Sequence, residues 1–325
     1  MSYGCRLLRN GERVVGALPA GSYIPLGENV ARQPDLKSLS LRAPALAGDM
    51  TYERFCVPRF SEYRTPDHLE LVTRARHHLR RAKLTRVKTH VGETVVYELD
   101  PDGGVSRGSI LVVHGWTSEA SFMMALGEPL RRSGFRVVLV DCPAHGRSHG
   151  ERTTLIDCAK ALVHVADVFG PFDGVLAHSM GSLAALMAGV GAHPLAHGVP
   201  FERYCIIAAP NKFSEVTGRF SARLGISAAA HRHFERQLSR IAHMSMRDYC
   251  GERFLKIVDK PVLVIHARDD QEVPFHNAVE MAESCRNATL MPFDGLGHRK
   301  VLYVPPVVRA VAGFFRNAGG GATQG

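Results

Sequence analysis

The stretch Ala177-His178-Ser179-Met180-Gly181 decides the fold of this 325-residue chain. The apolar run 173–179 leads into it, and the helix-forming sequence SLAALMAG follows it. A serine between a strand and a helix sits on a sharp turn, close to the free N–H groups of the helix N-terminus, which attract negative charge. The small residues that flank the serine let the strand and the helix approach each other. We therefore expect the hydroxyl of Ser179 to be held out above a sheet, although a plain helix-capping serine is the alternative.

Apolar runs alternate with helical stretches on both sides of this motif. Continuous Val, Ile and Leu runs that are separated by helices are typical of parallel strands buried on both faces. The expected strands are residues 109–114, 136–141, 173–179, 203–209, 261–267 and 288–293, preceded by two strands within 83–99 that join near Gly92. One helix is expected to begin at Pro66. Further helices are expected at about 118–133, 154–169, 180–190, 275–285 and 304–316. The sequence therefore predicts an α/β fold, with a mostly parallel central sheet and helices on both faces.

Three segments lie outside this alternation. Residues 1–60 contain five prolines, and we expect them to form an irregular N-terminal extension before a domain that spans residues 61–325. Residues 211–258 interrupt the alternation with helical, basic sequence, and we expect a small helical lid inserted between two core strands. The tail 318–325 is rich in glycine and is expected to be flexible.

The composition is that of a soluble globular protein, with 45% apolar and 22% charged residues. No stretch approaches the ~18 consecutive apolar residues of a transmembrane helix, and the N-terminus lacks the apolar core of a signal peptide. Seven cysteines, an odd number without a CxxC pair, indicate reduced thiols. These features predict a cytoplasmic protein without a membrane span.

The net charge of +9 is concentrated in residues 74–88 and 211–258. No helix-turn-helix spacing, zinc finger or RNP motif accompanies these basic segments, so we do not expect nucleic-acid binding. The sequence also lacks a P-loop, a GxGxxG motif after a strand, and metal-binding patterns such as HExxH. We therefore expect neither a cofactor nor a metal.

Four further features accompany the serine motif in chain order. His114-Gly115-Trp116 follows one expected strand, and the turn DCPAHGRS (141–148) follows the next. The acidic stretch 270–274 (DQEVP) follows a later strand, and Gly297-His298 follows the last strand. The serine motif has the form G-x-S-x-G, with alanine in place of the first glycine. Together these features resemble the α/β-hydrolase superfamily over roughly residues 83–316.

This resemblance implies a catalytic triad. Ser179 would be the nucleophile, and His298 would be the base that takes its proton and later protonates the leaving group. Asp270 would hold the histidine tautomer and stabilise the imidazolium. The backbone N–H groups of Trp116 and Met180 would form the oxyanion hole.

Several other polar residues compete for these roles. Asp269 competes with Asp270 as the acid, and the spacing to Val-Pro in the family favours Asp270. Asp141 also ends a strand, but we expect it to be structural within its turn. Among the seventeen histidines, His178 is expected to point away from the serine that it precedes, and His114 and His145 are expected to hydrogen-bond the loops around the site.

The predicted activity is hydrolysis of a carboxylic ester or thioester through an acyl-serine intermediate, with a small-molecule acyl compound as the substrate. Serine at position 179 argues against the dehalogenase and epoxide-hydrolase branches, which use aspartate there. Two alternatives stay open. An acyltransferase would use the same triad, and a non-catalytic binding protein could be built on the same fold.

Overall fold

The computed structural model describes residues 35–58 and 66–317, and those from Leu36 onward belong to one compact unit. An eight-stranded sheet crosses this unit in the order β1-β2-β4-β3-β5-β6-β7-β8. The strands are β1 (Lys83–Thr89), β2 (Gly92–Leu99), β3 (Ser109–Val113), β4 (Arg136–Asp141), β5 (Gly174–His178), β6 (Tyr204–Ile207), β7 (Val262–Ala267) and β8 (Ala288–Phe293). β2 pairs antiparallel with β1 and with β4, and the remaining pairs are parallel.

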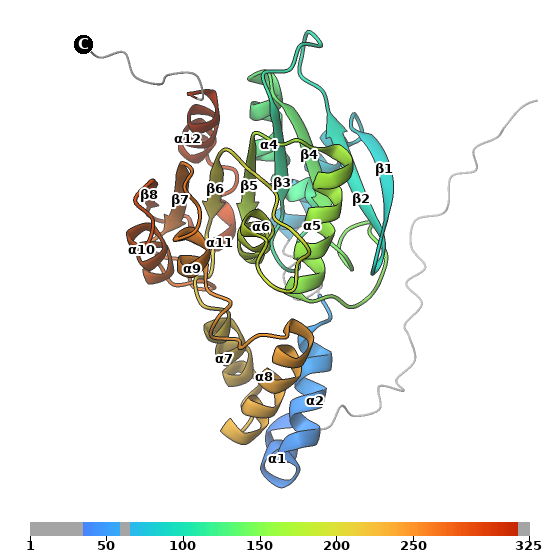
Figure 1. The fold of residues 1–325 in the computed structure, drawn as a ribbon, viewed down its shortest axis with the longest axis vertical. Coiled ribbons are helices and arrows are strands. Elements are labelled where there is room, and N and C mark those ends of the chain that lie inside the picture. The colour runs from blue at the N-terminus through green and yellow to red at the C-terminus, as the bar shows by residue number, and fades with distance from the viewer. Residues whose placement is uncertain (1–34, 59–65, 318–325) are drawn as a thin grey trace, which may run out of the picture. The chain divides into compact units, whose positions relative to one another are not determined.

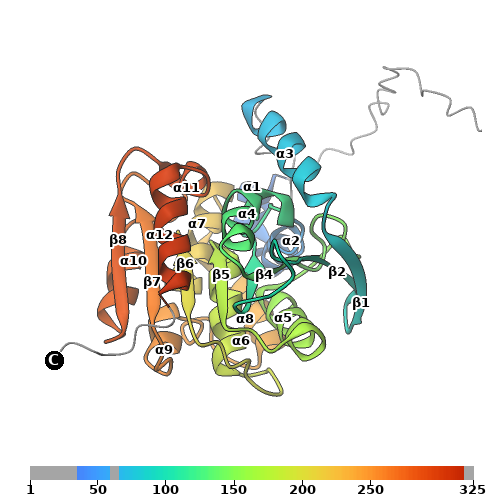
Figure 2. The ribbon, with the colours of Figure 1, turned by 90° about the horizontal axis from the view of Figure 1, so that it is seen from above.

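Helices cover both faces of the sheet, as the sequence predicts (Figures 1 and 2). One face carries α5 (Leu155–Phe169), α6 (Met180–Val190), α9 (Gly251–Leu255) and α10 (His276–Glu283). The other face carries α3 (Pro66–Leu79), the 3-10 turn η2 (Ala120–Met123), α4 (Met124–Arg132) and α12 (Pro305–Arg316). The short helix α11 (Gly297–Lys300) follows β8. Two separate apolar clusters therefore fill the space above and below the sheet.

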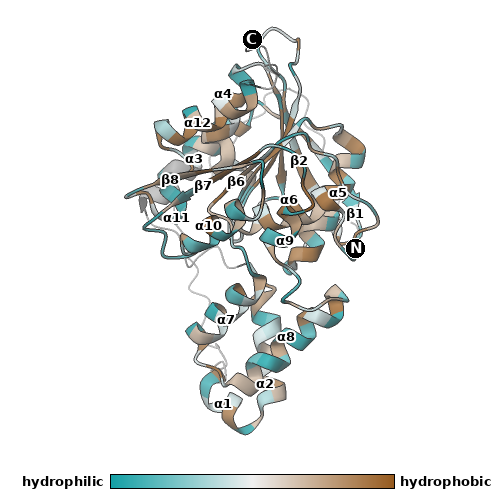
Figure 3. Cartoon of the chain, turned by 60° about the vertical axis from the view of Figure 1, so that its left-hand side comes forward, coloured by the Kyte–Doolittle hydropathy of each residue, from teal (hydrophilic) through white to brown (hydrophobic). Residues whose placement is uncertain are grey.

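The apolar runs form the buried strands. Every residue of β5, β6 and β7 is buried, and Figure 3 shows the sheet as the most hydrophobic layer of the chain. Side chains that alternate between two helix-covered faces must be apolar on both, which is why these segments lack the polar alternation of a half-exposed strand.

Four helices form a separate group beside the sheet, which we call the cap (Figure 1). Two of them, α7 (Phe213–Leu224) and α8 (Ala228–Ala242), come from the predicted insertion between β6 and β7. The other two, α1 (Leu36–Arg42) and α2 (Pro44–Phe55), come from the N-terminal part of the chain. Within 211–258, all of which the structure describes, no strand is present, and α9 completes the insertion.

The expectation of irregular structure in residues 1–60 is wrong for residues 36–55. Pro44 does not break a helix here, because it occupies the first turn of α2, where its missing N–H has no helical partner to lose. The remaining residues of that extension up to 34, and residues 59–60, lie outside the described part, as does the tail 318–325.

Helix α2 packs closely against α8. A Cβ atom on Gly48 would lie 2.7 Å from Cβ of His233, so the two helix backbones approach where glycine stands. Nearby, His233 Nε2 lies 2.9 Å from the Asp49 carboxylate, and the hydroxyl of Ser227 donates to the carbonyl of Ser40 over 2.8 Å. The N-terminal helices therefore form part of the cap.

Among residues 35–58 and 66–317, no helix combines the length and apolar character needed to span a membrane.

Candidate active site

Ser179 lies at the junction of β5 and α6, where the backbone turns sharply. Its φ of 52° and ψ of −129° fall in a region that non-glycine residues seldom adopt, and such strain is found mostly at functional sites. A Cβ atom on Gly181 would lie 2.1 Å from the carbonyl oxygen of His114, so glycine is required there. Ala177, in contrast, is an ordinary strand residue paired with Val113 and Ile206, and alanine fits that position.

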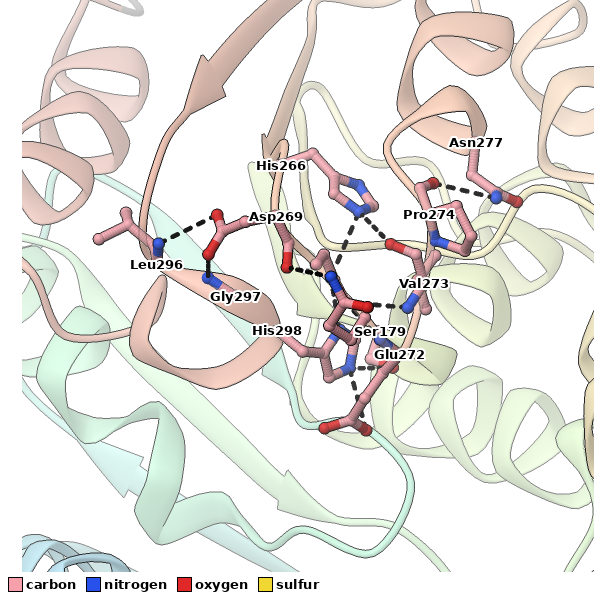
Figure 4. A network of polar contacts seen from close by, with 12 residues as sticks. Ser179, His266, Asp269, Glu272, Val273, Pro274, Asn277, Leu296, Gly297 and His298 are labelled. Carbon is pink, nitrogen blue, oxygen red and sulfur yellow. Dashed lines mark hydrogen bonds and ion pairs between the residues drawn. The ribbon is translucent and has the colours of Figure 1, made fainter. Parts of the chain in front are cut away.

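His298 lies between Ser179 and Asp270, as Figure 4 shows for the serine and the histidine. The Ser179 hydroxyl oxygen is 3.0 Å from Nε2 of His298, and Nδ1 of His298 is 2.7 Å from Oδ2 of Asp270. An ionised carboxylate only accepts, so Nδ1–H donates to Asp270 and Nε2 is left to accept the serine proton. All three residues are buried, at 7%, 5% and 9% exposure for Ser179, Asp270 and His298.

The carboxylate of Asp270 is held by several donors. Its Oδ1 accepts the backbone N–H groups of Glu272 at 2.8 Å and Val273 at 2.9 Å. Nε2 of His266 lies 3.3 Å from Oδ2 while donating to the carbonyl of Val273 over 2.8 Å (Figure 4). Burial raises the pKa of Asp270, but the hydrogen bonds from His266, His298 and the Val273 amide outweigh it, so the pKa lies below its usual value. Asp270 is therefore ionised at neutral pH.

Asp269 points away from the histidine. Its carboxylate accepts the N–H groups of Leu296 at 3.2 Å and Gly297 at 3.1 Å, as Figure 4 shows. It therefore fixes the turn into α11, the helix that carries His298. The structure brings Asp270 to the histidine, and Asp269 to the backbone before it.

Two backbone N–H groups lie near the serine without an intramolecular partner. A Cβ atom on Gly115 would lie 2.9 Å from Cβ of Ser179, so the loop after β3 runs beside the nucleophile. Within the described chain, the N–H groups of Trp116 and Met180 make no hydrogen bond. The Met180 amide is free because it belongs to the first turn of α6. Both can donate a hydrogen bond to a negatively charged oxygen.

Asp141 is structural, as expected. Its carboxylate accepts from the hydroxyl of Tyr97 at 2.9 Å and from the backbone N–H groups of Ala120 at 2.8 Å and Arg147 at 2.9 Å. A Cβ atom on Gly146 would lie 2.3 Å from this carboxylate, which explains the glycine of the turn.

His114 and His145 hold the loops, as the sequence indicates. Nδ1–H of His114 donates to the carbonyl of Gly115 over 2.7 Å, and its Nε2 accepts the N–H of Cys142 at 3.0 Å. Nδ1 of His145 lies 2.8 Å from the carbonyl of Pro143. Burial lowers the pKa of both histidines, to about 3 for His145. They are therefore neutral at physiological pH.

Three contacts of the site have no local signal in the sequence. Nε2–H of His178 donates to the backbone carbonyl of His298 over 2.9 Å, so His178 does point away from the serine but supports the histidine. His266 contacts Asp270, as described above. Glu272 Oε2 lies 4.0 Å from Nε2 of His298, and its carboxylate pairs with Arg299 at 3.1 Å. The fold brings His178 and His298 together from positions 120 residues apart, whereas His266 and Asp270 are neighbours at the end of β7.

A small, mostly apolar pocket adjoins the two free N–H groups. Its walls include Trp116, Cys142, Leu155, Met180 and Ala184. His114 also lines it, but both ring nitrogens of that residue are engaged with backbone groups. The cavity therefore suits the hydrocarbon part of a small molecule whose polar atom rests at the amides.

Comparison with known proteins identifies the family of this chain. The profile of the alpha/beta hydrolase family matches residues 110–312, more than half of the chain. A non-heme chloroperoxidase of Streptomyces lividans is 40% identical over 85 residues, which is 26% of this chain and 29% of that protein. This chain therefore matches less than a third of the length of that curated relative.

Solved structures share the fold. Est1E of Butyrivibrio proteoclasticus, with ferulic acid bound, is 19% identical with a TM-score of 0.59, covering 71% of this chain and 97% of that chain. The Pyrococcus furiosus esterase Pf2001 is 21% identical with a TM-score of 0.54, covering 73% and 92% of the two chains. Est2, an esterase of Thermogutta terrifontis, is 14% identical with a TM-score of 0.57, covering 74% and 94%. These likenesses, all below 25% identity, show a shared fold.

Proposed function

The chain belongs to the alpha/beta hydrolase family, and from this premise we propose that it is a serine hydrolase that cleaves a small carboxylic ester or thioester. The observation that carries the proposal is the continuous line of hydrogen bonds from Ser179 through His298 to Asp270, with distances of 3.0 and 2.7 Å. A serine hydroxyl is a weak nucleophile by itself and needs such a base to become reactive.

In the first half of the reaction, the Ser179 oxygen attacks the acyl carbonyl while Nε2 of His298 takes its proton. The imidazolium formed is stabilised by the Asp270 carboxylate, which stays ionised. The N–H groups of Trp116 and Met180 receive the oxyanion of the tetrahedral intermediate. His298 then gives its proton to the leaving alcohol or thiol, and the acyl group remains on the serine oxygen.

In the second half, water attacks the acyl-serine ester with His298 as the base. The second tetrahedral intermediate collapses, the proton returns to the Ser179 oxygen, and the carboxylic acid leaves. The carboxylate of Glu272, whose Oε2 lies 4.0 Å from Nε2 while Oε1 pairs with Arg299, adds negative charge beside the imidazolium in both halves. No cofactor enters these steps.

Hydrolysis of p-nitrophenyl esters and acyl thioesters by the purified chain tests the proposal, with Ser179→Ala as the control. We expect turnover in the unchanged protein and almost none in the variant. Equal rates in both proteins would show that the activity does not come from this serine.

Adding an alcohol or amine acceptor separates hydrolysis from acyl transfer. A hydrolase releases nearly the same fraction of acyl groups as free acid with and without the acceptor. An acyltransferase transfers most acyl groups to the acceptor. A binding protein without catalysis would bind esters and release no acid at all.

A further inference from the structure

A second apolar cavity lies beneath the cap, next to the cavity at the active site. Its walls include Leu155, Ile156, Phe213, Leu238, Ile241 and Tyr249. The walls come from the first turn of α5, from α7 and α8, and from the loop before α9. Leu155 is the residue that lines both cavities, so its side chain stands between them.

The first cavity is placed to receive the acyl part of a substrate. His298 must reach the leaving-group oxygen to protonate it, so the leaving group lies on the side of His298. The cavity walls come from the loops after β3 and β4 and from α5 and α6. In the sheet, β3 and β4 lie on one side of β5, which precedes the serine, and β8, which precedes His298, lies on the other side. A carbonyl oxygen at the amides of Trp116 and Met180 therefore directs the acyl chain into this cavity.

Accordingly, and resting on the proposed function, we propose that the substrates carry an unbranched aliphatic acyl chain and that Leu155 sets the chain length accepted. A short chain fills the first cavity and ends at Leu155. A longer chain has to pass this side chain to gain contact with the second cavity.

Leu155 is held firmly enough to act as a wall. It is the first residue of α5, and a reciprocal pair of hydrogen bonds between Thr154 and Asp157 fixes that end of the helix. The Thr154 N–H donates to Asp157 over 2.9 Å, and the Asp157 N–H donates to the Thr154 hydroxyl over 3.2 Å. Leu155 itself is buried, so its rotation is confined by its neighbours.

The second cavity suits hydrocarbon. The Tyr249 hydroxyl donates to the carbonyl of Ala242 over 3.1 Å, so it does not present a free donor to the space. Ile241, at the rim, is 42% exposed, and a chain end that covered it would remove apolar surface from water.

The test measures kcat/KM for p-nitrophenyl esters from acetate to laurate. Each methylene that gains apolar contact raises kcat/KM by up to about fourfold, so the profile climbs until the chain meets Leu155 and then stops climbing. We expect Leu155→Ala to move the maximum to longer chains by joining the cavities. We expect Leu155→Phe, which fills existing space, to move it to shorter chains.

Leu162→Ala is the matched control, because Leu162 is a buried leucine of the same helix that lines neither cavity. It should leave the position of the maximum unchanged. If Leu155→Ala fails to fold, the Leu155→Phe profile decides alone. A maximum at the same chain length in the Leu155 variants as in the unchanged protein would overturn the proposal.

Labelling with a fluorophosphonate keeps this test separate from that of the proposed function. If Ser179 is labelled and esters are hydrolysed, but the Leu155 variants have their maximal kcat/KM at the same chain length as the unchanged protein, only the chain-length inference fails. If Ser179 is not labelled and no ester is hydrolysed, the proposed function fails, and the inference that rests on it falls as well.

Discussion

The ring of Phe55 stacks on the ring of Trp116, with centroids 6.1 Å apart and planes 20° apart. Phe55 is the last residue of α2, and Trp116 lies in the loop whose free amide faces the oxyanion position in our proposal. The Thr153 N–H donates to the carbonyl of Cys56 over 2.9 Å, and Glu53 pairs with Arg152, so the end of α2 is tied to the start of α5. A segment outside the family match thus supports the active site.

Replacing Phe55 with alanine is expected to lower kcat more than it raises KM. Loss of the stacked ring frees the loop that carries the Trp116 N–H, which is one of the two proposed oxyanion donors. Complete loss of one such donor lowers kcat by about 10²–10³, and this is the upper limit for the effect of Phe55→Ala. Phe55→Tyr keeps the aromatic face and should keep most of the activity. Leu46→Ala is the control, since Leu46 lies on the same helix and is 52% exposed. Steady-state kinetics in which the Phe55→Ala and Leu46→Ala proteins matched would contradict the role of the stack.

Replacing Asp270 with asparagine should reduce kcat by up to about 10⁴, because the amide cannot hold the His298 tautomer. Asp269→Asn is the paired variant, and it should lose far less, since Asp269 binds only the backbone N–H groups of Leu296 and Gly297. The comparison is made with one ester at saturating concentration. A larger loss of kcat in Asp269→Asn than in Asp270→Asn would identify Asp269 as the acid of the triad.

His298→Ala should be inactive, whereas His178→Ala should retain measurable turnover. The first variant removes the base, and the second removes one hydrogen bond to the His298 carbonyl. An active His298→Ala protein together with an inactive His178→Ala protein would show that His178, and not His298, is the base.

Acid should destabilise the fold through buried histidines. Burial lowers the pKa of His114, His145 and His178 in the folded chain, whereas an unfolded histidine titrates near ~6.5. Below that pH the unfolded state binds more protons, so the free energy of unfolding falls by up to about 1.4 kcal/mol per pH unit for each histidine. For His145 this loss continues down to its folded pKa of about 3.

Urea denaturation at several pH values between neutrality and about pH 5 measures this loss. His145→Gln keeps a donor for the Pro143 carbonyl and removes one titrating group, so its unfolding free energy should depend less steeply on pH. Asp270 acts in the same direction at lower pH. Its pKa is depressed in the folded state, so its stabilising effect is present above its unfolded pKa of ~3.9 and is lost as the pH falls below that value. Equal slopes for His145→Gln and the unchanged protein would contradict the assignment of His145.

The core of the fold could be predicted because its signals are local. Each buried strand is a continuous apolar run, and the residues singled out for the site follow strands directly, as Ser179 follows β5 and Asp270 follows β7. In a parallel sheet the carboxyl ends of neighbouring strands meet at one edge, so sequence order already places these residues together.

The sequence did not predict the N-terminal cap helices α1 and α2, and the reason is physical. The buried face of α2 consists of Ala47, Gly48 and Thr51, which are small or polar and give almost no apolar periodicity. That face is suited to close packing against α8, which lies far away in the sequence. The contact of Phe55 with Trp116 depends in the same way on how two segments that are distant in the sequence are brought together, which no local pattern encodes.

The mass of the protein after reaction with a fluorophosphonate shows whether Ser179 is an activated nucleophile. We expect a single adduct that maps to Ser179, no adduct in Ser179→Ala, and strongly slowed labelling in His298→Ala, with ester turnover lost in parallel. Ser179→Ala should keep only the catalysis that substrate binding and the oxyanion hole provide, on the order of 10³–10⁴ over water. An unlabelled Ser179 in folded protein, or an adduct on another residue with turnover intact in Ser179→Ala, would contradict the account.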